Sequence, residues 1–344
     1  MELKKQVKGT MTIKLLMVSF LFLALFLLSF SIGRFPISPD MAAAILLSKI
    51  LNIPNHWNPD METIIFQIRL PRILAAALVG SALSVSGAAY QGMFRNPMVS
   101  PDILGVTAGA SFGAALGMLF SFSGIMIQVS AFVFGLAAVG ATCLIGALFA
   151  KRGEPGLVMI LGGIIIGTLF TSFVSIIKYV ADPYNTLPAI TFWLMGGLAT
   201  INIHDIYAIS APILAGMAVL FALRWNLNVL AFGDEEARAL GVRTGITRFA
   251  IIICATLITA AAVSISGIIA LVGLIVPHLA RLFVGPDYRY LIPVSIVLGA
   301  TFLLAVDDLA RFLLAVEIPL GIATSIIGAP FFLYLLFNTR KGWI

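Results

Sequence analysis

Long apolar runs are the feature that most constrains this chain. Of its 344 residues, 60% are hydrophobic and 10% are charged, whereas an ordinary soluble domain carries about 25% charged residues. A membrane-spanning helix needs about 20 mostly apolar residues, because lipid cannot satisfy backbone polar groups. We expect an all-α polytopic membrane protein with about ten transmembrane helices, at residues 13–32, 70–91, 103–121, 126–150, 157–180, 204–224, 248–266, 267–284, 290–307 and 319–337.

The basic residues predict how these spans are oriented. The first apolar run follows several lysines and is longer than the apolar region of a usual cleaved signal peptide, so we expect it to be retained. With the N-terminus inside, fifteen Lys and Arg side chains fall on the cytoplasmic side and six outside, as the positive-inside rule requires. We therefore expect a multi-pass cell-membrane protein with both termini in the cytoplasm. Its net charge of +6 is explained by topology and calls for no nucleic acid.

The sequence lacks motifs for nucleotide binding and metal binding. It contains no Gly-x-x-x-x-Gly-Lys-Ser/Thr loop, no His-Glu-x-x-His and no Cys-x-x-Cys. Cys143 and Cys254 both lie in apolar runs, and two cysteines are too few for a metal or disulfide framework. We expect a transport protein with no catalytic residues, no metal site and no cofactor of its own. An intramembrane enzyme is the less favoured alternative.

A weak internal repeat relates two parts of the chain. A shift of 180 residues aligns residues 84–87 with residues 264–267, both Ser-x-Ser-Gly, and aligns Pro97 with Pro277. In the expected topology the two segments have opposite orientations. Inverted repeats are typical of transporters that alternate between inward-open and outward-open states. We expect a single permease domain over residues 1–344, with repeat halves at roughly 69–200 and 248–337.

Glycines recur at four-residue spacing at Gly109, Gly113 and Gly117. Such a stripe allows two helix backbones to approach closely in lipid, where packing drives association. We expect this stripe to pack helices together and assign it no direct functional role.

Short motifs follow one another in a fixed order along the chain. They are Arg69–Arg72, Ser86–Gly87 with Gln91, Arg95–Pro97, Pro101–Gly105, Trp193–Gly197, Gly233–Gly241, Gly267–Arg281, Asp307–Arg311, Glu317–Gly321 and Gly328–Phe332. From about residue 60 to 337 this set resembles the FecCD-type permeases, which import iron-siderophores, haem and cobalamin. The resemblance implies a homodimer or a pair of similar permeases, two cytoplasmic ATPase subunits that bind ATP and Mg, and an extracytoplasmic substrate-binding protein.

Arg69, Arg72 and Arg311 lie at the expected outer face, against the positive-inside bias. Arginine forms strongly directional pairs with carboxylates. The resemblance implies that arginines at these motif positions dock on glutamates of the binding protein. The alternative is ordinary pairing with neighbours, for which Asp307 and Asp308 are the candidate partners of Arg311.

The longest expected cytoplasmic loop covers residues 226–247 and contains a short predicted helix from Asp234 to Leu240. Acidic residues in its first turn complement the helix dipole, and Gly241 is expected to cap its end. The resemblance implies that this segment couples the permease to the ATPase. The residues concerned are Gly233, Asp234, Glu235, Glu236, Ala237, Arg238, Leu240 and Gly241. A solvated surface helix is the alternative.

Candidates for the translocation path and its gate carry no charge. They are Ser84, Ser86, Gln91, Asn96, Pro97, Gly156 and Leu157. The last two belong to the loop 153–157, where the resemblance implies a cytoplasmic gate, although a cobalamin importer has small hydroxyl residues in their place. An uncharged path suits a large ligand that slides without sticking, and it suits a bare cation poorly.

A further motif contains Pro277, His278 and Arg281, near the inner end of an expected span. A lone intramembrane histidine can serve a proton relay or ligate haem. No second ligand has a suitable spacing, so we interpret the motif as structural.

The resemblance implies an ATP-driven importer that works by alternating access, and because iron complexes are the commonest cargo of the family we expect it to carry iron chelates, such as a ferric siderophore or haem. A cobalamin importer of the same family is the first alternative. An ion-coupled secondary transporter is the second. It is expected to need an intramembrane carboxylate, and no mid-span position holds Asp or Glu.

Overall fold

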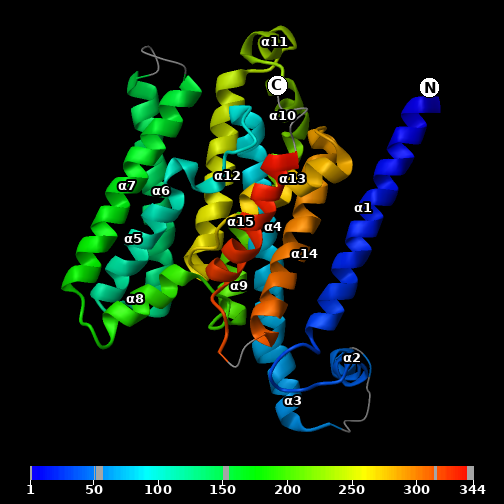
Figure 1. Cartoon of the computed structure of the whole chain (residues 1–344), viewed down its shortest axis with the longest axis vertical. Helices are drawn as coiled ribbons and strands as arrows, with labels where there is room; N and C mark the ends of the chain where they lie inside the picture. The colour runs from blue at the N-terminus through cyan, green and yellow to red at the C-terminus, as the bar shows by residue number, and fades with distance from the viewer. Residues whose placement is uncertain (1, 50, 52–56, 150–154, 314–315, 339–344) are drawn as a thin grey trace.

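The computed structural model describes residues 2–49, 51, 57–149, 155–313 and 316–338. Over these residues the chain is helical and contains no strand, which confirms the all-α prediction. Seven helices are long and apolar enough to cross a membrane. They are α1 (Glu2–Ser29), α4 (Leu70–Phe94), α6 (Gly124–Phe149), α7 (Pro155–Val180), α9 (Ile203–Ala222), α12 (Thr244–Ser266) and α14 (Tyr288–Phe312), and Figure 1 shows them in one bundle.

Shorter helices complete the bundle. They are α2 (Pro39–Ser48), α3 (Pro59–Thr63), η1 (Ile64–Arg69), η2 (Pro101–Leu104), α5 (Val106–Leu119), α8 (Thr186–Met195), α10 (Arg224–Leu230), α11 (Asp234–Ala239), α13 (Val272–Val284) and α15 (Leu320–Asn338). Two expected spans, 103–121 and 267–284, therefore hold helices shorter than predicted. Left-handed backbone at Gly105 precedes α5, and left-handed backbone at Gly267 and Leu271 precedes α13. These turns shorten both helices.

The bundle has two distinct ends (Figure 1). The end that carries α10 and α11, here called the α11 end, also holds the start of α1 and the end of α15. The opposite end, here called the α2 end, carries α2, α3 and α8. Basic residues expected inside lie at the α11 end, namely Arg95, Arg224, Arg238, Arg243, Arg248, Arg281 and Arg289. Which end faces the cytoplasm stays a prediction.

Helix α4 forms the centre of the bundle, and 20 of its 25 residues are buried. It packs against α12, α13 and α14, and small residues make this possible. A Cβ atom added to Gly87 of α4 would lie 1.8 Å from the carbonyl oxygen of Gly273 in α13. A Cβ atom added to Gly80 would lie 2.2 Å from the carbonyl oxygen of Gly299 in α14. The backbones are therefore in direct contact.

Helices α4 and α12, which contain the two Ser-x-Ser-Gly segments, pack side by side in opposite directions. Thr259 donates to Ser86 across 3.0 Å, and the Tyr90 hydroxyl lies 2.8 Å from that of Thr256. Residues 84–87 lie inside α4, whereas residues 264–267 end α12. The opposite directions fit an inverted repeat, and the equivalence of the two halves stays a prediction.

The glycine stripe of α5 packs against α6, as its spacing predicts. A Cβ atom on Gly109 would lie 2.4 Å from the carbonyl oxygen of Phe134, and one on Gly113 would lie 2.3 Å from that of Ser130. The same stretch contains a Gly-x-Ser-x-Gly pattern centred on Ser111. Ser111 lies within α5, buried, and donates to the carbonyl of Thr107. It is not the exposed nucleophile at a strand-to-helix turn that this pattern marks in hydrolases.

Three segments meet through their backbones near the α2 end. The amide of Gly197 donates to Ser266 across 2.8 Å, and the amide of Leu320 donates to Gly196 across 2.9 Å. A Cβ atom on Gly267 would lie 2.2 Å from the carbonyl oxygen of Trp193. These contacts join the end of α8, the end of α12 and the start of α15 at what we call the glycine junction.

Candidate functional site

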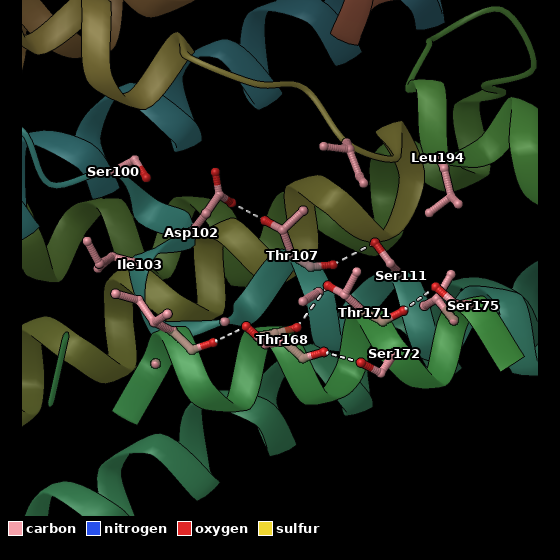
Figure 2. Close-up of a pocket in the computed structure, with 17 residues that line it drawn as sticks. Ser100, Asp102, Ile103, Thr107, Ser111, Thr168, Thr171, Ser172, Ser175 and Leu194 are labelled. Carbon is pink, nitrogen blue, oxygen red and sulfur yellow. Dashed lines mark hydrogen bonds between the residues drawn. The ribbon is translucent and has the colours of Figure 1, made fainter. Parts of the chain in front are cut away.

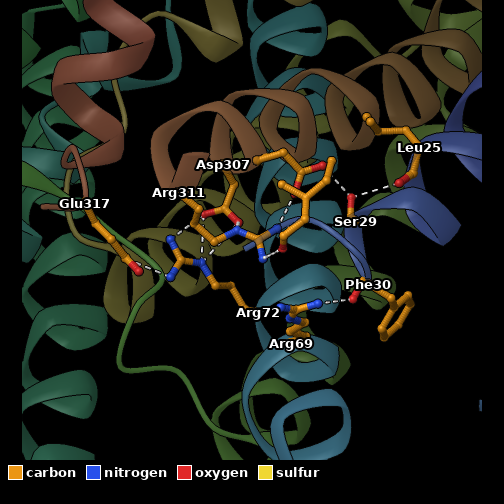
Figure 3. Close-up of polar contacts among 10 residues, drawn as sticks. Leu25, Ser29, Phe30, Arg69, Arg72, Asp307, Arg311 and Glu317 are labelled. Carbon is orange, nitrogen blue, oxygen red and sulfur yellow. Dashed lines mark hydrogen bonds and ion pairs between the residues drawn. The ribbon is translucent and has the colours of Figure 1, made fainter. Parts of the chain in front are cut away.

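A cluster of charged residues lies inside the bundle near the α2 end (Figure 3). The Arg72 guanidinium lies 2.9 Å from Asp307 and 2.8 Å from Glu317. Arg311 lies 3.1 Å from Asp307 and also pairs with Asp308. The cluster therefore ties α4 to α14 and to the segment that precedes α15.

Arg69 and Ser29 extend the cluster to α1. Arg69 donates to the backbone carbonyls of Phe30 and Phe35, and Ser29 donates to Asp308 across 2.5 Å. Arg69, Arg72 and Arg311 are only 3%, 6% and 6% exposed. The pairing of Arg311 with its two aspartate neighbours is confirmed. Docking of the binding protein on these three arginines stays a prediction. In this conformation their guanidinium groups point into the bundle and are not exposed to a partner.

The predicted helix of the cytoplasmic loop is present as α11, one residue shorter than expected. Gly241 has a φ of 83°, Val242 donates to the carbonyl of Ala237, and Gly241 donates to that of Arg238. This is the hydrogen-bond pattern of a Schellman cap, which confirms Gly241 as the cap residue. An ion pair of 2.7 Å between Asp234 and Arg248 fastens the start of α11 to α12.

Apolar residues of this loop divide into buried and exposed sets. Leu230, Ala237 and Val242 are buried against the bundle, whereas Phe232 is 73% exposed and Leu240 is 59% exposed. The first set holds the segment in place. The second set presents two large apolar side chains at the α11 end, and a contact of this set with the ATPase stays a prediction.

A groove of about 690 Å³ lies between α5, α7 and the turn that precedes α5 (Figure 2). Its lining contains no Lys, Arg, His, Asn, Gln, Tyr or Trp side chain. The lining residues are Ser100, Asp102, Ile103, Gly105, Thr107, Ala108, Ser111, Gly163, Ile164, Gly167, Thr168, Thr171, Ser172, Val174, Ser175, Leu194 and Ile268. The groove is thus lined by hydroxyls, apolar groups and one carboxylate.

Six of the seven hydroxyls in the groove donate their protons within the chain. Four belong to an exposed stripe on α7 and donate to carbonyls four residues earlier in the helix, at 2.8 to 3.0 Å. These are Thr168, Thr171, Ser172 and Ser175. Thr107 donates to Asp102, and Ser111 donates to Thr107. Because the protons are used, the hydroxyls offer acceptor lone pairs to the groove.

The predicted path residues lie elsewhere. Ser84 and Ser86 are completely buried in the packing around α4, and Gln91 is 2% exposed. Asn96 and Pro97 line a smaller pocket at the α11 end. In this conformation Ser84 and Ser86 contact neighbouring helices and lie outside the groove, which favours a packing role. Their place on the path stays a prediction.

The predicted gate lies at the start of α7. Gly156 approaches Phe94 of α4, with 3.8 Å between an added Cβ and the ring, and Leu157 is 55% exposed. Residues 153 and 154 of the same loop lie outside the described residues. Pro277 and His278 are buried within α13, and Arg281 lies in its last turn.

The α7 stripe and Asp102 were missed by the sequence reasoning. Residues 168, 171, 172 and 175 recur at the spacing of one helix face, and this pattern could have identified the stripe. Asp102 is an exposed carboxylate in the turn between two apolar helices. An acidic residue between two apolar runs was the available signal for it.

Comparison with known proteins supports this arrangement. The profile of the FecCD transport family matches residues 21–338. The chain belongs to the FecCD transport family. It is therefore a multi-pass membrane permease of an ABC importer.

Two relatives and one solved structure show how far the similarity to other FecCD proteins extends. The molybdate import permease MolB of Haemophilus influenzae is 40% identical over 315 residues, which are 92% of each chain. The hemin permease HmuU of Yersinia pestis is 35% identical over 334 residues, 95% of this chain and 96% of its own. An inward-facing structure described as a metal-chelate type ABC transporter superposes with a TM-score of 0.84 at 38% identity. It covers 94% of this chain and 98% of that one.

Proposed function

We propose that this permease imports a metal chelate, foremost a ferric siderophore or haem, by ATP-driven alternating access. Two copies of the chain would form the path between them. Two cytoplasmic ATPase subunits would bind ATP and Mg, and an extracytoplasmic binding protein would deliver the ligand. The same path chemistry would accept cobalamin, so cobalamin is the first alternative cargo.

The groove lining is the observation that carries the proposal. Its hydroxyls present acceptors, and its one ionisable lining residue is the carboxylate Asp102. A chelate with a large apolar surface can pass along such a lining. A tetrahedral oxyanion such as molybdate, the cargo named for MolB, has no apolar surface and offers only acceptors, and a lining whose hydroxyls already donate within the chain matches it poorly.

The exposed face of α7 supports the placement of the path. In the most apolar 18-residue stretch of α7, only 17% of the residues are buried inside the single chain. The hydroxyl stripe lies on the exposed face of this helix. Polar residues on an intramembrane surface face a bundle interior or a water-filled path more often than lipid. A second copy facing α7 would enclose the groove.

The proposal is tested by uptake into proteoliposomes that contain the chain and its co-purified ATPase, with the binding protein outside. Ferric siderophore, haem, cobalamin and molybdate are offered separately. Leu240→Asp places a charge on the exposed side of the coupling loop, and we expect uptake to fall at least about tenfold. Leu51→Asp is the matched control, because Leu51 is 54% exposed at the opposite end.

ATP-dependent uptake of a metal chelate, lost in Leu240→Asp and kept in Leu51→Asp, supports the proposal. Uptake of molybdate alone would overturn the assigned cargo. Uptake without the ATPase, driven by an imposed ion gradient, would replace the importer with a secondary transporter.

A further inference from the structure

A small pocket at the α11 end has a chemistry opposite to that of the groove. It measures about 260 Å³ and lies where α4 ends, α13 ends and α14 begins. Arg95 and Arg281 line it, and no Asp or Glu does. Ala231, two residues before the coupling residues Gly233–Gly241, forms part of its wall.

Arg281 has only neutral partners. Its Nη2 donates to Gln91 across 3.0 Å, the Tyr288 hydroxyl lies beside its guanidinium, and no acceptor lies in hydrogen-bond geometry with its buried Nη1. The Gln91 amide is neutral, so it does not balance the charge. The nearest chain carboxylate in sequence, Asp287, is engaged by Arg289 and Asn228. A partly buried guanidinium with an unused donor is costly unless an acceptor of negative charge is present.

Arg95 brings a second guanidinium at a strained position. It follows the last residue of α4 with φ 52° and ψ 33°, a left-handed conformation. Glycine is the usual residue there, because a side chain adds strain. Arg95 is exposed and forms no ion pair within 4 Å with any described residue, although its guanidinium and the Glu236 carboxylate of α11 both approach Gly233. A strained position that carries arginine points to a use for the side chain.

Further donors surround the two arginines. Asn96 accepts a hydrogen bond from Met98 through its oxygen, which leaves its amide nitrogen available. The Tyr288 hydroxyl lies beside Arg281, and the Tyr288 ring packs against Gly92. Donors therefore converge on the pocket from the end of α4, from α13 and from the start of α14.

We propose that this pocket binds a phosphate group, which is supplied either by soluble inorganic phosphate or by the headgroup of an anionic lipid. Arginine is well suited to phosphate, because its planar fork donates two parallel hydrogen bonds. Donors converge from three elements, and the oxygens of a tetrahedral anion can accept from all of them, whereas a planar carboxylate offers two. The bound group would brace α4 and α13 against the segment that leads into α11. The site is independent of the cargo.

The test measures binding to the purified full-length chain, without transport. Inorganic phosphate is titrated in neutral detergent against chloride of equal ionic strength, and affinity is measured by calorimetry. In a second arm, lipid nanodiscs contain phosphatidylglycerol or only phosphatidylcholine, and native mass spectrometry counts the retained anionic lipid. The variants are Arg95→Gln and Arg281→Gln. Arg289→Gln is the control, because Arg289 lies at the same end but pairs with Asp287.

We expect each pocket variant to weaken phosphate binding by about tenfold or more and the control to leave it unchanged. Loss of retained phosphatidylglycerol in both pocket variants, with weak phosphate binding throughout, would assign the site to a lipid headgroup. Arg95→Gln alters an exposed side chain, so this variant still tests phosphate binding if Arg281→Gln fails to fold. If neither arm depends on either arginine, the proposal is overturned and the pocket is left for an acidic side chain of a partner.

Discussion

Arg72 and Asp307 form an ion pair inside the bundle, with 2.9 Å between the charged atoms and side chains that are 8% and 0% exposed. Asp307 also pairs with Arg311. Removing one member of a buried pair leaves the other charge uncompensated and costs about 3–5 kcal/mol. We expect Asp307→Ala to lower the free energy of unfolding by this amount, measured by denaturation in detergent.

The control for this prediction is Glu62→Ala. Glu62 pairs with Lys49, but the two side chains are 31% and 57% exposed. A surface pair contributes about 0–1 kcal/mol, so the control should lose little stability. Equal losses in the two variants would show that burial is not what makes the Asp307 cluster important.

Gly87→Ala should separate α4 from α13. Its new methyl group would lie 1.8 Å from the carbonyl oxygen of Gly273, and a backbone atom cannot rotate away. Overpacking of this kind costs about 1–3 kcal/mol or more. The control is Gly140→Ala in α6, where no atom lies within 4 Å of the added Cβ. It should be neutral or stabilising by up to about 1 kcal/mol. Thermal unfolding midpoints distinguish the two.

Gly241 caps α11 with a φ of 83°, and no atom lies within 4 Å of a Cβ added to it. Any cost of a side chain there comes from backbone strain alone, about 1–2 kcal/mol for Ala. Asn tolerates the left-handed conformation, so Gly241→Asn should cost less than Gly241→Ala. We expect limited proteolysis to cut the loop faster in the Ala variant, with ATP-driven uptake reduced in the same order. Equal behaviour of Ala and Asn would contradict the cap.

The hydroxyl stripe of α7 should affect transport without affecting stability. Thr171 and Ser172 donate only to carbonyls of their own helix, so Thr171→Val with Ser172→Ala leaves packing between helices unchanged. We expect chelate uptake to fall about two- to tenfold at an unchanged unfolding midpoint. Ser210→Ala in α9 removes a hydroxyl that donates in the same way to Ile206 outside the groove. Slower chelate uptake in the Ser210→Ala control would contradict the assignment of the translocation path to the groove.

Asp287 precedes α14 outside the spanning helices and accepts hydrogen bonds from Arg289 and Asn228. Burial raises the pKa of Asp287, but these hydrogen bonds and the Arg289 charge outweigh it, so its pKa lies below the usual 3.8. A lowered pKa stabilises the fold above the unfolded pKa, and this contribution is lost as pH falls through the folded pKa. The stability difference from Asp287→Asn should therefore be constant above about pH 5 and shrink below about pH 4. A stability difference that grows as the pH falls would contradict the lowered pKa of Asp287.

Much of the helical architecture could be predicted from the sequence, because lipid requires long apolar helices. The loop at residues 226–247 was also legible, since its acidic first turn and Gly241 are local signals. The lengths of α5 and α13 were not. They depend on left-handed turns at Gly105 and Leu271, and a run of apolar residues does not reveal where a backbone turns.

The interior charges show why the site was harder to predict. From the sequence, Arg72 and Arg311 are arginines at an outer face, available to a partner. Whether a guanidinium points outward depends on which carboxylates lie across the helix contact. Asp307 is 235 residues away from Arg72 and yet pairs with it. Such a contact is set by the packing of α4 on α14, which the sequence pattern does not specify.

The glycine junction has a consequence for motion. At Gly196, Gly267 and Gly321 the backbone of one segment touches the backbone of another, with no side chain between them. Side chains can relax a contact gradually by changing rotamer, but touching peptide planes cannot. We therefore expect the ends of α8 and α12 and the start of α15 to move together as one rigid unit. An opening of the permease at this end would then rotate this unit as a whole, without a gradual loosening inside the junction.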